Sequence, residues 1–153
     1  MSEKREGPLW DALAGKAPWP PVAKLLGWTP VEVEPGSVVI AYEAREEFYN
    51  PHGFVQGGIL AAMLDDAMGP ALAAMLEPGL MAPTIELKVN FVRAAKAGRL
   101  IAHGRVVHRG RSIAFLEGRL ETPDGALVAT ATATARIVGT ASAEPPAEGA
   151  GSL

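Results

Sequence analysis

The segment from Gly57 to Leu76 constrains this chain most, because it is apolar almost throughout and yet contains two adjacent carboxylates, Asp65 and Asp66. As a helix, the segment has apolar side chains on nearly every face, so the rest of the chain must wrap around it. An ionised carboxylate in such a helix is costly unless it is paired or takes part in chemistry. The segment therefore predicts a central helix that carries a reaction site.

The loop that leads into this helix ends in Gly57-Gly58. Amides in the first turn of a helix have no intrahelical acceptor, so either glycine N–H can hold a carbonyl oxygen as negative charge builds on it. The same glycines would also suit a tight turn with no further role. Asp65 follows roughly 12 Å further along the axis, and small residues such as Gly69 leave a slot beside it. Asp66 points about 100° away, where it can simply meet solvent or an arginine.

The composition narrows the class of protein. The 153 residues suit one domain, and a formal net charge of −3 provides no basic surface for nucleic acid. The chain has no cysteine, which excludes a thiol nucleophile, a disulfide and a Cys-rich zinc site. No apolar run resembles a signal peptide or is long enough to span a bilayer. We expect a cytoplasmic protein whose partners include neither nucleic acid nor a membrane.

The chain divides into a Pro/Trp-rich arm at 1–34, a domain at 35–138 and a flexible Pro/Gly-rich tail at 139–153. The arm has room for short helices near residues 9–14 and 22–26 between its prolines. Strand-like runs occupy residues 37–46, 84–93, 99–109, 112–121 and 126–138.

The arrangement of these runs predicts the fold class. In residues 84–93, Ile85, Leu87, Val89 and Phe91 alternate with polar residues, which predicts one buried face. The last four runs lie so close in sequence that an antiparallel meander is the simplest topology. Together they predict an α+β fold in which a curved antiparallel sheet of five or six strands wraps a long central helix.

Three motifs also carry a resemblance. They are N-x-x-G-x-V-Q-G-G-x-x-x-x-x-L-D-D-A-M-G from Asn50, T-I-E-L-K-V-N-F-V-R-A from Thr84 and V-V-H-R-G-R-S from Val106. In order and content the chain resembles the hotdog-fold acyl-CoA thioesterases, and within them the phenylacetate-degradation (PaaI-like) branch. The resemblance implies a homodimer with a continuous sheet, often paired into a tetramer, with active sites at the dimer interface.

The resemblance also implies roles for single residues. Asp65 matches the catalytic carboxylate, as general base or as nucleophile, and Gly57 matches the amide donor to the thioester carbonyl. Asn50 matches a loop residue that places the water or the carbonyl, and Thr84 matches a hydroxyl that reaches the site from the partner subunit. Many relatives have His where this chain has Gln56, which cannot transfer a proton near neutral pH but can hydrogen-bond.

Other residues are candidates for binding the substrate. His52, Gln56 and Gly58 belong to the loop before the helix, and His52 can equally serve loop structure alone. Cationic or turn residues that could meet the phosphates of CoA, or remain ordinary solvated groups, are Arg93, Lys96, Arg109, Gly110, Arg111 and Ser112. His103 and His108 fit structural or surface roles, and no spacing of residues indicates a metal site.

The sequence thus predicts an acyl-CoA thioesterase that needs no cofactor, CoA being part of its substrate. One alternative is a hotdog hydratase or dehydratase, for which His52 and Asp65 would be the acid/base pair. The other is an acyl-CoA-binding module without catalysis, although a proline-broken arm makes a poor DNA-binding segment for a regulator.

Overall fold

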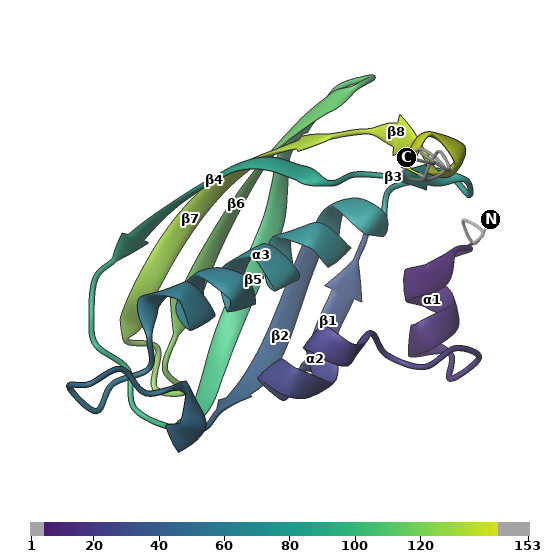
Figure 1. The fold of residues 1–153 in the computed structure, drawn as a ribbon. Helices are drawn as coiled ribbons and strands as arrows, with labels where there is room; N and C mark the ends of the chain where they lie inside the picture. Colours follow the sequence, from purple (N-terminus) through teal and green to yellow (C-terminus); the bar gives the residue numbers. More distant parts are fainter. Residues whose placement is uncertain (1–4, 144–153) are drawn as a thin grey trace, which may run out of the picture.

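The computed structural model describes residues 5–143, in which one long helix lies across a curved antiparallel sheet (Figure 1). The helix is α3, Gly57–Ala73, and the order of strands in the sheet is β1-β2-β5-β6-β7-β4. The strands are β1 Thr29–Glu34, β2 Ser37–Ala44, β4 Thr84–Phe91, β5 Gly98–Arg109, β6 Ile113–Glu121 and β7 Leu127–Arg136. The predicted α+β hotdog arrangement is therefore confirmed.

The strand order corrects one part of the predicted topology. Strands β5, β6 and β7 form the expected meander, but β4 pairs with β7 at the far edge instead of with β5, and β2 pairs with β5. Residues 92–97 carry the chain from that edge back to the middle of the sheet. The amides of Val92 and Arg93 donate to the carbonyl of Val128, which holds this crossing against β7. Proximity in sequence does not reveal such a crossing, because the order of strands depends on contacts between residues that are distant in sequence.

The N-terminal arm contributes more to the fold than the sequence predicts. Its short helices are α1, Pro8–Leu13, and α2, Pro21–Leu26, as expected. The residues after them form the edge strand β1, which pairs with β2 and has an irregularity between Pro30 and Glu32. A proline in a run normally argues against a central strand, but an edge strand tolerates it.

The remaining elements lie around the two ends of α3. The 3-10 helix η1, Glu46–Phe48, precedes the loop that leads into α3. Beyond α3, β3, Leu80–Met81, pairs with β8, Val138–Gly139, and the 3-10 helix η2, Thr140–Ala143, follows. The first five residues of the predicted flexible tail are thus ordered against the end of α3. The rest of the tail prediction, and residues 1–4 of the arm, fall outside the described residues.

The sheet covers one half of α3. The residues on this half are fully buried, and they are Leu60, Met63, Leu64, Ala67, Met68, Ala71 and Leu72. Both aspartates lie on the other half and are only half-buried in the single chain. None of the helices in the described part of the chain has both the length and the apolar character to cross a membrane.

Two glycines set how closely the helix approaches the sheet. A Cβ at Gly104 on β5 would collide with the backbone carbonyl of Ala67, and one at Gly118 on β6 would lie 3.2 Å from the Cγ of Met68. The backbone of α3 therefore rests directly on β5. Such contact is possible only where the strand has no side chain on its inner face.

The predicted burial of the β4 apolar face is wrong for the single chain. Ile85 and Phe91 are 58% and 56% exposed, and Leu87 is exposed as well. The reason is that β4 is the edge strand of the sheet, and α3 covers its apolar face only in part: the Phe91 ring lies beside Gly57 but is still largely exposed. An exposed apolar edge strand is a surface that proteins normally pair or cover.

Gly104→Ala tests the close approach of helix and sheet. We expect it to lower the free energy of unfolding by about 1–3 kcal/mol or more, because a backbone atom of α3 stands where the methyl group would go. Urea unfolding measures the change. Gly69→Ala is the control: no atom lies within 4 Å of a Cβ there, and alanine is about 1 kcal/mol better than glycine inside a helix. Equal stability of wild type and Gly104→Ala would contradict the described contact.

Candidate active site

In the described part of the chain, the amides of Gly57 and Gly58 at the entrance of α3 hydrogen-bond to no protein acceptor. Gln56 is the N-cap, and its Oε1 accepts a hydrogen bond from the Ile59 amide at 3.2 Å. The amides of Gly57 and Gly58 precede the first possible intrahelical bond, so they can donate to a ligand. A Cβ at Gly58 would lie 2.7 Å from the Gln56 Oε1, so this capping geometry requires glycine. Gln56 therefore supports the loop by hydrogen bonding.

Asn50 organises the loop before the helix. Its Oδ1 accepts hydrogen bonds from the amides of His52, at 2.9 Å, and Phe54, at 3.2 Å. The side-chain NH₂ of Asn50 is left to donate elsewhere. Asn50, His52, Gly57 and Arg93 together line a surface groove of about 430 Å³ at this end of the molecule. The structure thus brings four of the predicted site residues together.

Asp65 lies midway along the open half of α3. The hydroxyl of Thr84, the first residue of β4, donates to its Oδ1 at 2.9 Å. Among the described residues no donor hydrogen-bonds to the other oxygen. The resemblance implied a Thr84 from the partner subunit, but this contact is made within one chain. One oxygen of Asp65 is thereby oriented while the other stays available.

Asp66 has a buried partner that the sequence analysis missed. The hydroxyl of Tyr42 on β2 donates to its Oδ2 at 2.8 Å, and the Tyr42 side chain is fully buried. Burial raises the pKa of the Asp66 carboxyl; the Tyr42 hydrogen bond opposes this effect, and the Asp65 charge adds to it. Burial and Asp66 also raise the pKa of Tyr42 far above its usual range. The sequence feature that could have predicted this pair is a tyrosine in the apolar run of residues 38–42, because a buried hydroxyl needs a hydrogen-bond partner.

The turn between β5 and β6 is not part of this groove. It lies at the other end of α3 (Figure 1), where Arg109 forms an ion pair of 2.7 Å with Glu77. The Gly110 amide donates to the Ile113 carbonyl, so this amide is not open to a phosphate, and the Ser112 carbonyl accepts from the Ile137 amide. Arg111 is exposed.

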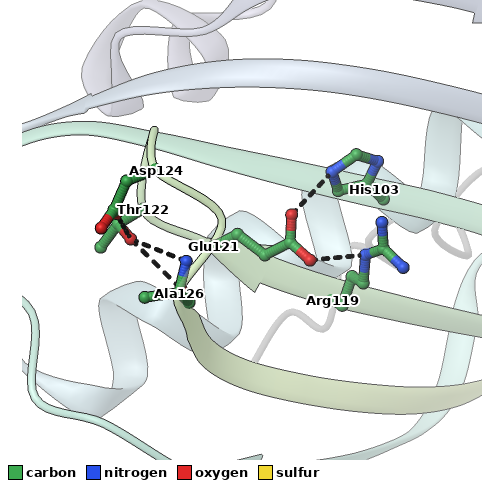
Figure 2. Close-up of polar contacts among 6 residues, drawn as sticks. All are labelled: His103, Arg119, Glu121, Thr122, Asp124 and Ala126. Atoms are coloured by element: carbon green, nitrogen blue, oxygen red, sulfur yellow. Dashed lines mark hydrogen bonds and ion pairs between the residues drawn. The ribbon is translucent and has the colours of Figure 1, made fainter.

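The two histidines of β5, His103 and His108, contact other side chains of the sheet. Figure 2 shows His103 beside Glu121, at 3.2 Å, with Arg119 holding the other carboxylate oxygen at 2.8 Å. His103 neighbours Gly104, whose inner face meets α3, so its own side chain lies on the opposite face of the sheet. The His108 ring lies 6.3 Å from that of Phe115. Within residues 5–143 no three His, Asp or Glu side chains are grouped so that they could hold a metal ion.

The distance between the two ends of the site limits what a single chain can do. Asp65 lies eight residues beyond Gly57 on one straight helix, which is roughly 12 Å along the axis. A catalytic carboxylate and an oxyanion donor must each lie about 3 Å from the reacting group. The Gly57 amide and the Asp65 carboxylate of one chain therefore cannot act on the same carbonyl.

Residues 52–129 match the model of the thioesterase superfamily. The chain belongs to that superfamily. The structure of a phenylacetic acid degradation-related protein from Ralstonia eutropha JMP134 is 43% identical, with a TM-score of 0.80 over 84% of this chain and 98% of that one. The PaaI protein of E. coli shares the fold, with 23% identity and a TM-score of 0.77 over 86% of this chain and 94% of that one. A 1,4-dihydroxy-2-naphthoyl-CoA hydrolase of Listeria monocytogenes is 28% identical over 82 residues, which are 54% of this chain and 67% of the relative. The predicted enzyme class, a thioester hydrolase of the PaaI-like kind, is confirmed.

The pair of Tyr42 and Asp66 makes stability depend on pH. Because the pKa of Asp66 is raised on folding, its contribution is fully present below the unfolded pKa, near pH 4, and is lost as pH rises through the folded pKa. We expect the stability of wild type relative to Asp66→Asn to fall between pH 4 and pH 7, by about 1.4 kcal/mol for each tenfold difference in proton affinity. Urea unfolding of both proteins across this range measures it. A difference that stays constant or grows with pH would refute the assignment.

Proposed function

We propose that this protein hydrolyses acyl-CoA thioesters, with Asp65 as the catalytic carboxylate, in a site that two copies of the chain complete. The observation that carries the proposal is the half-buried Asp65 on α3, hydrogen-bonded by Thr84 through one oxygen only, in a chain of the thioesterase superfamily. A carboxylate held at one oxygen keeps the other free to take a proton or to attack.

The reaction needs few catalytic groups. The Gly57 N–H polarises the thioester carbonyl and holds the developing oxyanion. Asp65 removes a proton from the attacking water, or attacks the carbonyl itself to form an anhydride that water then hydrolyses. The C–S bond breaks, the sulfur leaves as the CoA thiolate and takes up a proton, and the acyl group leaves as the free acid. Thr84 orients Asp65, and the NH₂ of Asn50 places the water or the carbonyl.

A second copy of the chain would bring together the two catalytic groups, the Gly57 amide and the Asp65 carboxylate. The exposed β4 edge, with Ile85 and Phe91, is suited to extend the sheet into a partner's β4. Such an assembly can bring the Gly57 amide of one subunit near the Asp65 carboxylate of the other. Arg93 in the same groove, and the exposed Arg111 at the far turn, are available for CoA phosphates.

Asp65→Asn tests the catalytic assignment. We expect the variant to keep its fold and to lose about 100- to 10,000-fold in kcat, because asparagine can neither accept the proton nor attack. Release of the CoA thiol from a panel of acyl-CoA esters measures it. Asp66→Asn, the same change one residue on, is the matched control and should lose far less. Near-normal hydrolysis by Asp65→Asn would end the proposal.

A mixed dimer tests whether the site is shared. Gly57→Pro removes the amide donor but suits the first position of a helix after an extended Gln56, so alone it should lower kcat about 100- to 1000-fold. Gly57→Ala keeps the amide and serves as its control. In a purified dimer of one Asp65→Asn and one Gly57→Pro subunit, a shared arrangement leaves one site intact, and about half of the wild-type rate should return. If each site used only its own chain, both sites would be damaged and the rate would stay low.

A further inference from the structure

A second hollow lies at the other end of α3. It encloses about 320 Å³ between that end of the helix and α1. Gly69 and Ala73 of α3 form one wall, residues 76–82 form another, and Leu9 and Trp10 of α1 close the far side. Apart from polar groups at its rim, the lining is apolar.

The hollow continues the face of the helix that holds Asp65. Gly69 is four residues beyond Asp65, one helical turn or roughly 6 Å along the axis and on the same side. Nothing lies within 4 Å of a Cβ built on Gly69, so the space beside the helix is open there. If the carbonyl carbon of a thioester lies beside Asp65, its acyl chain reaches the hollow one helical turn further along α3.

The two ends of this helix face differ in chemistry. The groove at the start of α3 has a mostly apolar lining, but Asn50, His52 and Arg93 add polar groups and a cation to it, which suit the anionic parts of CoA. The hollow at its end presents the side chains of Leu76, Met81 and Trp10, which suit an apolar group. Among the described residues that line this hollow there is no lysine or arginine to pair with an acyl group that itself ends in a carboxylate.

We infer that this hollow binds the acyl group of the thioester, and that the substrates are esters of uncharged, medium-length aliphatic or aryl acids. The inference rests on the proposed function. A volume of 320 Å³ lies at the lower end of the range for small-molecule sites, which suits such groups better than long fatty chains. Trp10 forms the far wall and determines the acyl length that fits.

The far wall lies outside the residues that match the superfamily model. Helix α1 lies outside the matched residues 52–129. It is attached to the sheet by Arg5, whose guanidinium pairs with Glu34 of β1 at 2.8 Å and lies 4.8 Å from the centre of the Trp10 ring. A change in the arm can therefore alter the pocket without touching Asp65 or Gly57.

The test is a series of saturated acyl-CoA esters from acetyl to dodecanoyl, together with phenylacetyl-CoA, read as kcat/KM by thiol release. For wild type we expect a gain of about 4-fold per added methylene until the hollow is full, and no gain after that. Gly69→Leu puts a side chain into the open space. It should lower kcat/KM for octanoyl-CoA and phenylacetyl-CoA about 60-fold more than for acetyl-CoA, the value of three buried methylenes.

Trp10→Ala is the second variant. Because it removes the far wall, kcat/KM should go on rising to longer acyl chains than in wild type before it levels off. Trp19→Ala is its matched control: Trp19 belongs to the same arm but packs on Trp28, with ring centres 4.4 Å apart. Size-exclusion chromatography checks assembly, and if Gly69→Leu disrupts it, Trp10→Ala decides. Hydrolysis with a chain-length profile unchanged in both variants overturns this inference and leaves the proposed function standing. No hydrolysis of any ester by wild type overturns the proposed function, and the acyl pocket with it.

Discussion

The direct contact between the backbone of α3 and strand β5 at Gly104 determines where every functional group lies. It seats the helix deep in the sheet, so the apolar half of α3 is buried and the half with Asp65 and Asp66 faces outward. The two carboxylates diverge by about 100° around the helix. Each therefore finds a hydroxyl from a different side of the sheet: Tyr42 of β2 reaches Asp66, and Thr84 of the edge strand β4 reaches Asp65. The same depth of packing thus separates Asp66, paired with a buried tyrosine, from Asp65, the carboxylate proposed to be catalytic.

The features predictable from the sequence were those set by local pattern. The start of α3 at Gly57, the strands and the short arm helices follow from periodicity, glycine and proline. The position of β4 at the far edge does not, because strand order depends on contacts distant in sequence. Strand β1 was missed because Pro30 argues against a strand, and only pairing with β2 reveals the edge position. The Tyr42 partner of Asp66 lies 24 residues away, and no local pattern shows which of two adjacent aspartates would face it.

The spacing along α3 also explains why the single chain looks incomplete. A carboxylate and an oxyanion donor two helical turns apart are each well supported, yet they cannot meet on one carbonyl. The exposed apolar side chains of β4 are similarly unfavourable in a lone chain and favourable in a pair. One arrangement, a second copy joined through β4, addresses both. Under the proposed function, assembly would be part of the catalytic apparatus, since it would bring the Gly57 amide of one subunit to the Asp65 carboxylate of the other.

A thioester makes modest demands on its enzyme, because the thiolate leaves readily and needs little acid catalysis. A carboxylate and one amide donor can therefore serve many acyl groups, and they offer little means of choosing among them. Discrimination has to come from contacts with the acyl group, where each methylene contributes about 0.8 kcal/mol. In this chain such contacts include α1, which lies outside the matched superfamily residues. Because α1 touches neither Asp65 nor Gly57, a substitution in the arm can change acyl preference while the proposed catalytic groups stay the same.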